Sequence, residues 1–228
     1  MGDYVFNPAP RPAAPVEGGG FFPVRRIFCV GQNYAAHARE MGGDPSREPP
    51  FFFSKPADAL VTGGADTPFP SLTQNLHHEI ELVVAIDKGG ANIPAARAEN
   101  HVHGYAAGLD LTRRDLQAEA RKTGKPWDMS KGFDNSAPLG LIRPAEKTGH
   151  PKAGRISLKV NGVVTQEGDL ADLIWSVPEI IAALSAYVAL APGDLIFTGT
   201  PSGVGPLERG DVLLGKIEGV GEVRTKVV

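Results

Sequence analysis

Cysteine is almost absent from this sequence, since Cys29 is the only one among 228 residues. A single thiol excludes an internal disulfide. Because Cys29 lies within an apolar stretch, we expect it to fill space in the core rather than to act as a nucleophile. This usage of cysteine fits a protein of a reducing compartment.

A strong charge of either sign is also missing, as are long apolar runs. The net charge of −3 and the pI near 6.1 argue against nucleic acid or an anionic membrane as a partner. No apolar run approaches the length that crosses a bilayer. The N-terminus has no basic segment followed by an apolar core, so no secretory signal is predicted. We therefore expect a cytoplasmic protein.

Glycine and proline, by contrast, are abundant, with 28 and 20 residues respectively. This composition is typical of many turns and short strands, and it predicts a mixed β fold with short helices. Residues 1–20 are rich in Pro, Ala and Gly and predict an extended N-terminal arm with little packing of its own. Residues 21–228 are predicted to form one domain around one core.

The stretch Leu76–Ile86 is predicted to be a β-strand because aliphatic and β-branched residues dominate it. Side chains alternate across a strand, so Glu79 and Glu81 are expected on one face. Two carboxylates on an otherwise apolar strand repel each other and resist burial unless a cation lies between them. The simpler alternative is an edge strand whose end is exposed to solvent.

A third acid favours the metal interpretation. Asp110 ends a second apolar stretch, Val102–Leu109, where an acid has no obvious structural purpose. Three hard oxygen ligands with no cysteine nearby suit Mg²⁺, or Mn²⁺, better than Zn²⁺. The alternative is three unrelated surface acids. We take Glu79, Glu81 and Asp110 as candidate metal ligands.

A possible general base lies in the short predicted helix from Tyr34 to Met41. His37 and Glu40 are three residues apart and therefore share a helix face. A carboxylate at that spacing can orient an imidazole for proton transfer, although an exposed His–Glu pair looks the same in sequence. Lys55 follows a run of three phenylalanines and precedes a proline, which favours a lysine held against an anion over an ordinary surface lysine.

Two further segments could contact an anionic ligand. A helix is predicted from Leu111 to Lys122, with Thr112 as its N-cap, and it places Arg114 and Gln117 on one face. That face could bracket a ligand or could simply be solvated. The loop that begins Gly199-Thr200-Pro201 lacks the spacing of a phosphate-binding loop, but its backbone N–H groups and the Thr200 hydroxyl could bind a carboxylate. A hairpin is predicted at Asn161-Gly162.

Taken together, these motifs resemble the fumarylacetoacetate hydrolase family over nearly everything from Phe22 to the C-terminus. The residues that carry the resemblance are His78 to Glu81, Gly108 to Gln117, and Pro192 to Gly205. Within the family, the segments Asn33–Glu40, Pro49–Ala57 and Arg113–Trp127 are most similar to the fumarylpyruvate hydrolases of gentisate catabolism.

The resemblance implies a β-barrel-like roll, usually a homodimer, and a role for each candidate residue. Glu79, Glu81 and Asp110 match the metal ligands. His37 and Glu40 match a dyad that activates water on a lid helix, and Lys131 matches a lysine close to metal and substrate. The family positions that contact substrate are matched here by Lys55, Arg114, Gln117 and Thr200.

The activity implied is metal-dependent hydrolysis of a carbon–carbon bond in a 2,4-dioxo acid, with fumarylpyruvate giving fumarate and pyruvate. An acylpyruvate hydrolase or an oxaloacetate decarboxylase acting on a smaller oxo acid is the alternative within enzymes. A non-catalytic module that only binds carboxylates is the alternative outside them, and the His37–Glu40 pair argues against it because a pure binder needs no general base.

Overall fold

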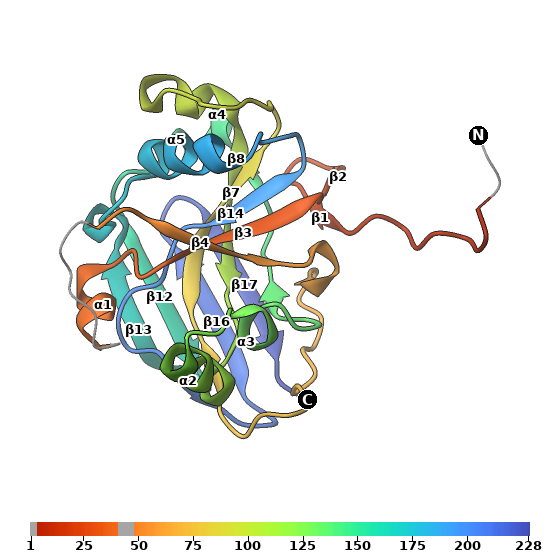
Figure 1. Ribbon diagram of the computed structural model, residues 1–228, viewed down its shortest axis with the longest axis vertical. Helices are drawn as coiled ribbons and strands as arrows, with labels where there is room; N and C mark the ends of the chain where they lie inside the picture. Colours follow the sequence, from red (N-terminus) through yellow and green to blue (C-terminus); the bar gives the residue numbers. More distant parts are fainter. Residues whose placement is uncertain (1–3, 41–47) are drawn as a thin grey trace.

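The computed structural model describes residues 4–40 and 48–228, without the side chains of residues 38–40 (Figure 1). Short strands dominate these residues, and the helices between them are short. The predicted fold class, mixed β with short helices, is confirmed. The side chain of Glu40 is not part of what the structure describes.

A six-stranded sheet forms the centre of the molecule (Figure 1). In order across the sheet, its strands are β11 (Arg143–Pro144), β8 (Val102–Leu109), β7 (Ile80–Ile86), β14 (Asp194–Phe197), β3 (Arg26–Gly31) and β4 (Phe51–Lys55). Only β14 and β3 run parallel; the other neighbours are antiparallel. Because β14 and β3 are parallel, the segments that follow them emerge at the same edge of the sheet.

Strand β7 is buried on both of its faces. Ile80, Leu82, Val84 and Ile86 pack into one hydrophobic core, whereas Val83 and Ala85 pack into a second core on the other side of the sheet. The alternation predicted from the sequence is therefore correct, and the strand separates two apolar layers.

A four-stranded antiparallel sheet packs against β7 and β8 (Figure 1). Its strands, in order, are β13 (Val163–Asp169), β12 (Arg155–Val160), β16 (Val212–Ile217) and β17 (Gly221–Lys226). Asn161 and Gly162 join β12 to β13 with φ of 51° and 83°. These left-handed values are those of a two-residue hairpin turn, so the predicted hairpin is confirmed.

The predicted continuous strand from Leu76 to Ile86 is wrong in one respect, because it is interrupted at Glu79. The residues before the break form β6 (Leu76–His78), which belongs to a different, three-stranded sheet with β15 (Gly205–Leu207) and β9 (Thr112–Arg113). The chain thus changes sheets at Glu79. A residue at such a junction can turn its side chain away from both ladders, which no alternation of residue types reveals.

The helices lie around the sheets (Figure 1). They are α1 (Ala35–Glu40), α2 (Arg114–Thr123), α3 (Asp128–Lys131), α4 (Ala145–Thr148) and α5 (Val177–Tyr187), with 3₁₀ turns η1 (Ala57–Ala59), η2 (Ala95–His101) and η3 (Leu170–Asp172). The predicted N-cap Thr112 is wrong: it pairs in β9, and its hydroxyl donates to the Asp110 carbonyl at 3.2 Å. No helix among residues 4–40 and 48–228 is long and apolar enough to cross a membrane.

The N-terminal segment packs more than its composition predicts. Strand β1 (Ala13–Pro15) pairs with β2 (Phe21–Pro23), and Ala14 is fully buried. Gly18, Gly19 and Gly20 all have positive φ and form the turn between these strands. Glycines whose composition favours an extended arm therefore make a hairpin, and the exposed residues 4–11 extend from the molecule (Figure 1). The short strands β5 (Leu60–Val61) and β10 (Ala137–Pro138) pair elsewhere.

Candidate metal centre and substrate pocket

Three acids from separate elements meet below the surface. Glu79 lies at the junction of β6 and β7, Glu81 lies on β7, and Asp110 follows β8. Because β7 and β8 pair with Ile80 opposite Leu109, the Asp110 N–H donates to the Glu79 carbonyl at 2.9 Å. One carboxylate oxygen from each acid lies within 4.8 Å of the others, and all three residues are buried. The sequence-based grouping is confirmed.

Three cationic side chains surround these acids. The Lys131 ammonium lies 2.7 Å from Glu79 Oε2 and 2.7 Å from Asp110 Oδ2. Arg114 contacts the other oxygen of Glu79 at 2.5 Å, and Lys55 lies 2.8 Å from Asp110 Oδ1. The three buried carboxylates are therefore matched by three positive charges, which offsets much of the cost of taking them out of water.

The acids are not equivalent electrostatically. Burial alone raises the pKa of Glu79, but Lys131 and Arg114 outweigh burial and hold that pKa below its usual value. Burial raises the pKa of Glu81 well above its usual value, and the nearby Asp110 and Glu79 carboxylates raise it further. Glu81 receives a backbone hydrogen bond from the Gly199 N–H at 2.7 Å.

The residues present fit a divalent cation. The donors are carboxylate oxygens only, and a cation beside Glu81 would stabilise the charge that burial and its neighbours disfavour. Gly199 has φ of 102°, and a Cβ there would lie 2.7 Å from the Asn33 side chain. Glycine thus lets the backbone N–H approach Glu81 closely. Glu79, Glu81 and Asp110 form a divalent metal site.

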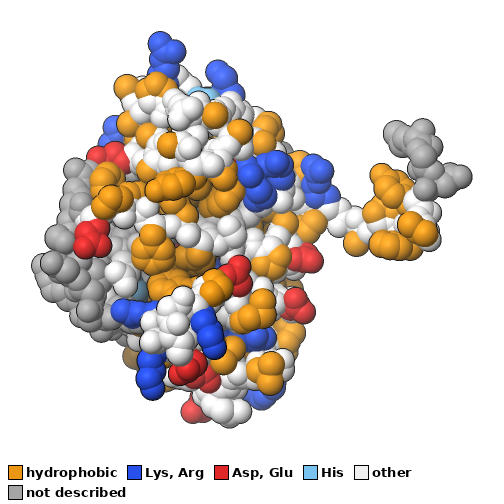
Figure 2. Space-filling model, in the orientation of Figure 1, with side chains coloured by type: hydrophobic (Ala, Val, Ile, Leu, Met, Phe, Trp, Pro, Cys, Tyr) orange, Lys and Arg blue, Asp and Glu red, His pale blue; other side chains and the backbone are white. Residues whose placement is uncertain are grey.

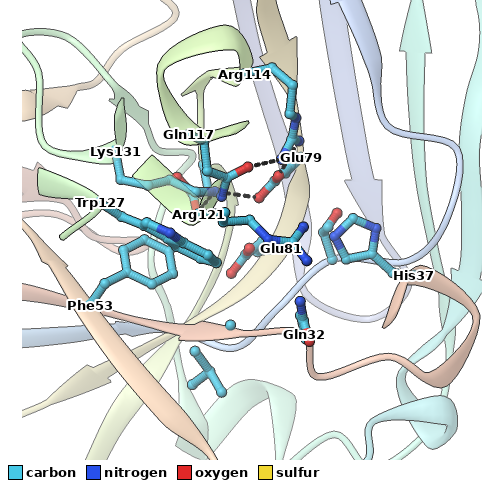
Figure 3. Close-up of a pocket in the computed structure, with 14 residues that line it drawn as sticks. Gln32, His37, Phe53, Glu79, Glu81, Arg114, Gln117, Arg121, Trp127 and Lys131 are labelled. Atoms are coloured by element: carbon cyan, nitrogen blue, oxygen red, sulfur yellow. Dashed lines mark hydrogen bonds and ion pairs between the residues drawn. The ribbon is translucent and has the colours of Figure 1, made fainter. Parts of the chain in front are cut away.

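A pocket opens above the acids (Figure 3). One wall is the inner face of α2, where Arg114, Gln117 and Arg121 follow one another at helical spacing. Arg114 donates to the Gln117 amide oxygen at 2.5 Å, so these two side chains form one unit with Glu79. The predicted shared face of Arg114 and Gln117 therefore points into the pocket rather than into solvent.

A second wall is aromatic. Phe53 of β4 and Trp127 lie with ring centroids 5.8 Å apart, and both line the pocket (Figure 3). Phe51 packs edge-on against Trp127 and is 40% exposed. Hydrophobic side chains gather on this face of the molecule, around the place where β4 lies in Figure 1 (Figure 2). The pocket thus combines a charged floor with an apolar side wall.

Of the remaining predicted site residues, two line the pocket and one lies beneath it. His37 of α1 is buried and lines the pocket, as does Thr200. The side chain of Glu40, its predicted partner, lies outside the described residues. Lys55 does not line the pocket: its ammonium lies beneath Asp110 and donates to the carbonyls of Leu111 and Lys131. Lys55 is thus placed to hold Asp110 and α3, and its contact with substrate stays a prediction.

Sequence reasoning missed Gln166, which is 1% exposed on β13. Its amide oxygen accepts from the Ile80 N–H at 3.1 Å, and its amide nitrogen donates to the Thr200 hydroxyl at 2.8 Å. One side chain therefore links the metal-binding junction to the loop after β14. The residues around Gln166 are mostly polar, as in a strand exposed to solvent, so the local sequence does not distinguish this residue from its neighbours.

Sequence reasoning also missed Arg121 and the aromatic wall. Arg121 lies seven residues after Arg114, so the helical period that paired Arg114 with Gln117 could have identified it. Phe53 and Trp127 are 74 residues apart in sequence, and only the fold brings them together.

Comparison with known proteins agrees with this geometry. The family described as fumarylacetoacetate (FAA) hydrolase, C-terminal, matches residues 26–228. The chain belongs to the fumarylacetoacetate hydrolase family. This assignment confirms the resemblance seen in the sequence, and the family's fold accounts for the arrangement of sheets described above.

Among solved structures, the fumarylpyruvate hydrolase of Pseudomonas aeruginosa, crystallised with Mn²⁺ and pyruvate, is 54% identical with a TM-score of 0.97, and the match covers 99% of each chain. A fumarylpyruvate hydrolase of Ralstonia sp. is 45% identical over 81% of this chain and 95% of its own. The mitochondrial oxaloacetate tautomerase FAHD1 of Mus musculus is also 45% identical, over 89% of this chain and 91% of its own.

Proposed function

We propose that this family member hydrolyses the carbon–carbon bond of a dianionic 2,4-dioxo acid, with fumarylpyruvate as the substrate and fumarate and pyruvate as products. The main observation in support of this proposal is the charge of the site. Three carboxylates are matched by three cationic side chains, so a bound divalent ion leaves two net positive charges in a largely buried pocket. Such a site favours a ligand with two negative charges.

The proposed reaction uses the pocket residues in order. His37 takes a proton from water, and the resulting hydroxide adds to the carbonyl carbon farther from the pyruvoyl carboxylate. The bond from that carbon to the methylene carbon then breaks, and its electron pair stays with the pyruvate fragment as an enolate. The proton that His37 took from water is returned to the enolate carbon and completes pyruvate, while the acyl fragment leaves as fumarate.

The other residues bind, orient and neutralise. We propose that Thr200, Arg114 and Gln117 orient the pyruvoyl carboxylate and its neighbouring oxygen, and that Lys131 stabilises the charge that develops as the bond breaks. A bound divalent ion would supply Lewis-acid stabilisation of the same charge. Mg²⁺ is the proposed ion, and the Mn²⁺ in the Pseudomonas aeruginosa structure supports Mn²⁺ as a substitute.

Two features support a fumaryl group at the far end of the pocket. The aromatic wall of Phe53 and Trp127 suits a flat, conjugated chain, and Arg121 supplies a positive charge at the same pocket. We propose that Arg121 binds the terminal carboxylate. The assembly expected from the family, a homodimer, is tested separately by the mass measured by light scattering after gel filtration.

The second candidate is an enzyme of oxaloacetate, either a tautomerase or a decarboxylase. The likeness to the mouse oxaloacetate tautomerase favours it, because oxaloacetate is also a dianionic oxo acid. An acylpyruvate hydrolase acting on a shorter, uncharged acyl chain uses the same chemistry. A carboxylate-binding module without activity would show ligand-induced stabilisation and no turnover.

An absorbance assay tests these alternatives. Purified protein loaded with Mg²⁺ should consume fumarylpyruvate, lose that activity with EDTA and regain it when Mg²⁺ is added back in excess. Oxaloacetate and acetylpyruvate, assayed in parallel, should give lower kcat/KM. Higher kcat/KM with oxaloacetate, or no turnover of fumarylpyruvate, would overturn the proposal.

The variant Arg121→Ala sharpens the test of the substrate. It should lower kcat/KM for fumarylpyruvate by roughly 10-fold or more, since one charged hydrogen bond is lost. It should leave kcat/KM for acetylpyruvate nearly unchanged, because that substrate has no terminal carboxylate. Equal losses with both substrates would remove Arg121 from the terminal subsite. Lys122→Ala, an exposed neighbour on α2, is the matched control.

A further inference from the structure

Gln166 uses its whole amide in hydrogen bonds inside the protein. The oxygen accepts from the Ile80 N–H at 3.1 Å and faces His78 Nδ1 at 2.9 Å. The nitrogen donates to the Thr200 hydroxyl at 2.8 Å and to the Pro201 carbonyl at 2.9 Å. A primary amide has two protons and two lone pairs to offer, so this side chain is satisfied.

Two backbone groups fix which way the amide points. The Ile80 N–H can only donate and the Pro201 carbonyl can only accept. A flipped amide would place its N–H₂ against the Ile80 N–H and its oxygen against the Pro201 carbonyl, which would create two repulsive contacts in a buried site. The orientation therefore follows from the backbone and not from the other side chains.

The fixed amide determines the role of the Thr200 hydroxyl. Thr200 Oγ1 accepts from Gln166, and its hydroxyl makes no other hydrogen bond with residues 4–40 and 48–228. Its own proton is left to be donated, and Thr200 lines the pocket. A carboxylate or carbonyl oxygen of a ligand can only accept, so a hydrogen bond between it and Thr200 must use the Thr200 proton.

We propose that Gln166 is a positioning residue that keeps the Thr200 proton directed at an anionic oxygen of the bound oxo acid. This inference rests on the proposed function, because it assigns the ligand oxygen to a pyruvoyl group. It also explains why a glutamine on a separate sheet reaches the metal-binding junction: one amide sets both the Ile80 backbone and the Thr200 proton. Gln166 itself does not line the pocket.

Calorimetric binding of pyruvate to the Mn²⁺-loaded protein tests the proposal. Gln166→Glu keeps the size of the side chain but offers Thr200 an acceptor, so the Thr200 proton turns away from the ligand. We expect pyruvate affinity to fall roughly 10-fold or more, as expected for a lost hydrogen bond to a charged group. Thr200→Val should lose a similar factor, and Thr200→Ser, which keeps the hydroxyl, should lose less affinity than Thr200→Val.

The double variant Gln166→Glu/Thr200→Val is the decisive comparison. If Gln166 acts through Thr200, the double variant binds pyruvate no worse than Thr200→Val alone. Gln166→Met, which neither donates nor accepts strongly, should lie between the unaltered protein and Gln166→Glu. Losses that multiply in the double variant, or equal losses for the Met and Glu variants, would overturn the proposal.

Two measurements separate this result from other causes. Thermal unfolding of each variant without metal shows whether it folds, and Mn²⁺ titration without pyruvate shows whether the added charge of Gln166→Glu weakens the ion itself. Unaltered protein that does not bind pyruvate would overturn the proposed function together with this inference. Binding by the unaltered protein with multiplying losses in the variants would overturn the inference alone.

Discussion

At the scale of single residues, the buried acids differ in what neutralises each of them. Glu79 contacts Lys131 and Arg114, and Asp110 contacts Lys131 and Lys55. In the part of the chain that the structure describes, Glu81 instead accepts a hydrogen bond from the Gly199 backbone N–H, and burial raises its pKa well above the usual value. Of the three acids, Glu81 is therefore the one whose buried charge a divalent ion would stabilise most.

Replacement of that acid tests the metal site. Glu81→Gln keeps the shape of the side chain but removes its charge, so we expect Mn²⁺ affinity to fall roughly 100-fold or more. Isothermal titration of Mn²⁺ measures the change. Glu119→Gln, an exposed position on α2, should leave the affinity as it is. Unchanged Mn²⁺ affinity in Glu81→Gln would exclude Glu81 as a ligand.

Replacement of the proposed base should separate metal binding from turnover. His37→Ala removes the imidazole that lines the pocket but none of the three acids. We expect turnover of fumarylpyruvate to fall by about 10²- to 10⁴-fold, the usual contribution of a general base. Mn²⁺ affinity should change little. Single-turnover kinetics with an unaltered chemical step would contradict the role assigned to His37.

Sequence reasoning succeeded at the residues whose signal is local. Glu79, Glu81 and Asp110 are acids within apolar strands, and burial of an acid needs a reason that chemistry supplies. Gln166 escaped because its partners are 34 and 86 residues away and its own segment is mostly exposed. Lys55 contacts an anion, as its sequence context predicts, and that anion is the Asp110 carboxylate.

At the scale of elements, alternation predicted the two faces of β7 and the Asn161-Gly162 turn, while the ends of elements were less predictable. Thr112 could either cap the helix or pair as a strand residue, and in the structure it pairs with β6. Helix α2 therefore begins at Arg114, and Asp115 takes over the stabilisation of its first turn. The Asp115 carboxylate accepts from Thr73 Oγ1 at 2.6 Å and from the Gln74 N–H at 3.0 Å.

This contact has a pH dependence that can be measured. Burial opposes ionisation of Asp115, but hydrogen bonds from Thr73, Gln74 and Leu116 outweigh it and lower its pKa. A lowered folded-state pKa means that the carboxylate contributes stability above its usual pKa of about 4 and loses it as pH falls through the folded value. Because Asp115 is only partly buried and solvent screens its charge, Asp115→Asn should lower the free energy of unfolding near neutral pH by less than about 1 kcal/mol.

Urea unfolding of the two proteins without metal, repeated from pH 6 downward, checks this expectation. The difference in the free energy of unfolding should narrow as the solution becomes more acidic, because only the carboxylate titrates. A difference that is the same at every pH would show that Asp115 acts through its shape alone.

At the scale of the whole molecule, two hydrophobic layers enclose the central sheet, and Cys29 lies in one of them on β3. Burial raises the pKa of its thiol well above the usual value, and the Asp110 carboxylate adds to this effect. Both the burial and the protonated state make a thiol unreactive. The predicted role of Cys29 as core filler agrees with this position.

Thiol labelling can then report on the fold. We expect an aromatic disulfide reagent to leave the native protein unlabelled and to react with one thiol per chain in denaturant, as followed by absorbance. Labelling of the native protein should be as slow as its unfolding. Fast labelling of protein whose secondary structure is intact would contradict the closed core.

Three cationic side chains neutralise the three buried acids, and this charge balance affects the order of folding and metal binding. Many small metalloproteins cannot collapse before their ion arrives, because unpaired ligands oppose it. Here Lys131, Arg114 and Lys55 already hold two of the acids in place, so the polypeptide can reach its final shape first and load afterwards. The ion it carries would then reflect which divalent cation the surroundings supply at the time, and exchange of one for another need not involve unfolding.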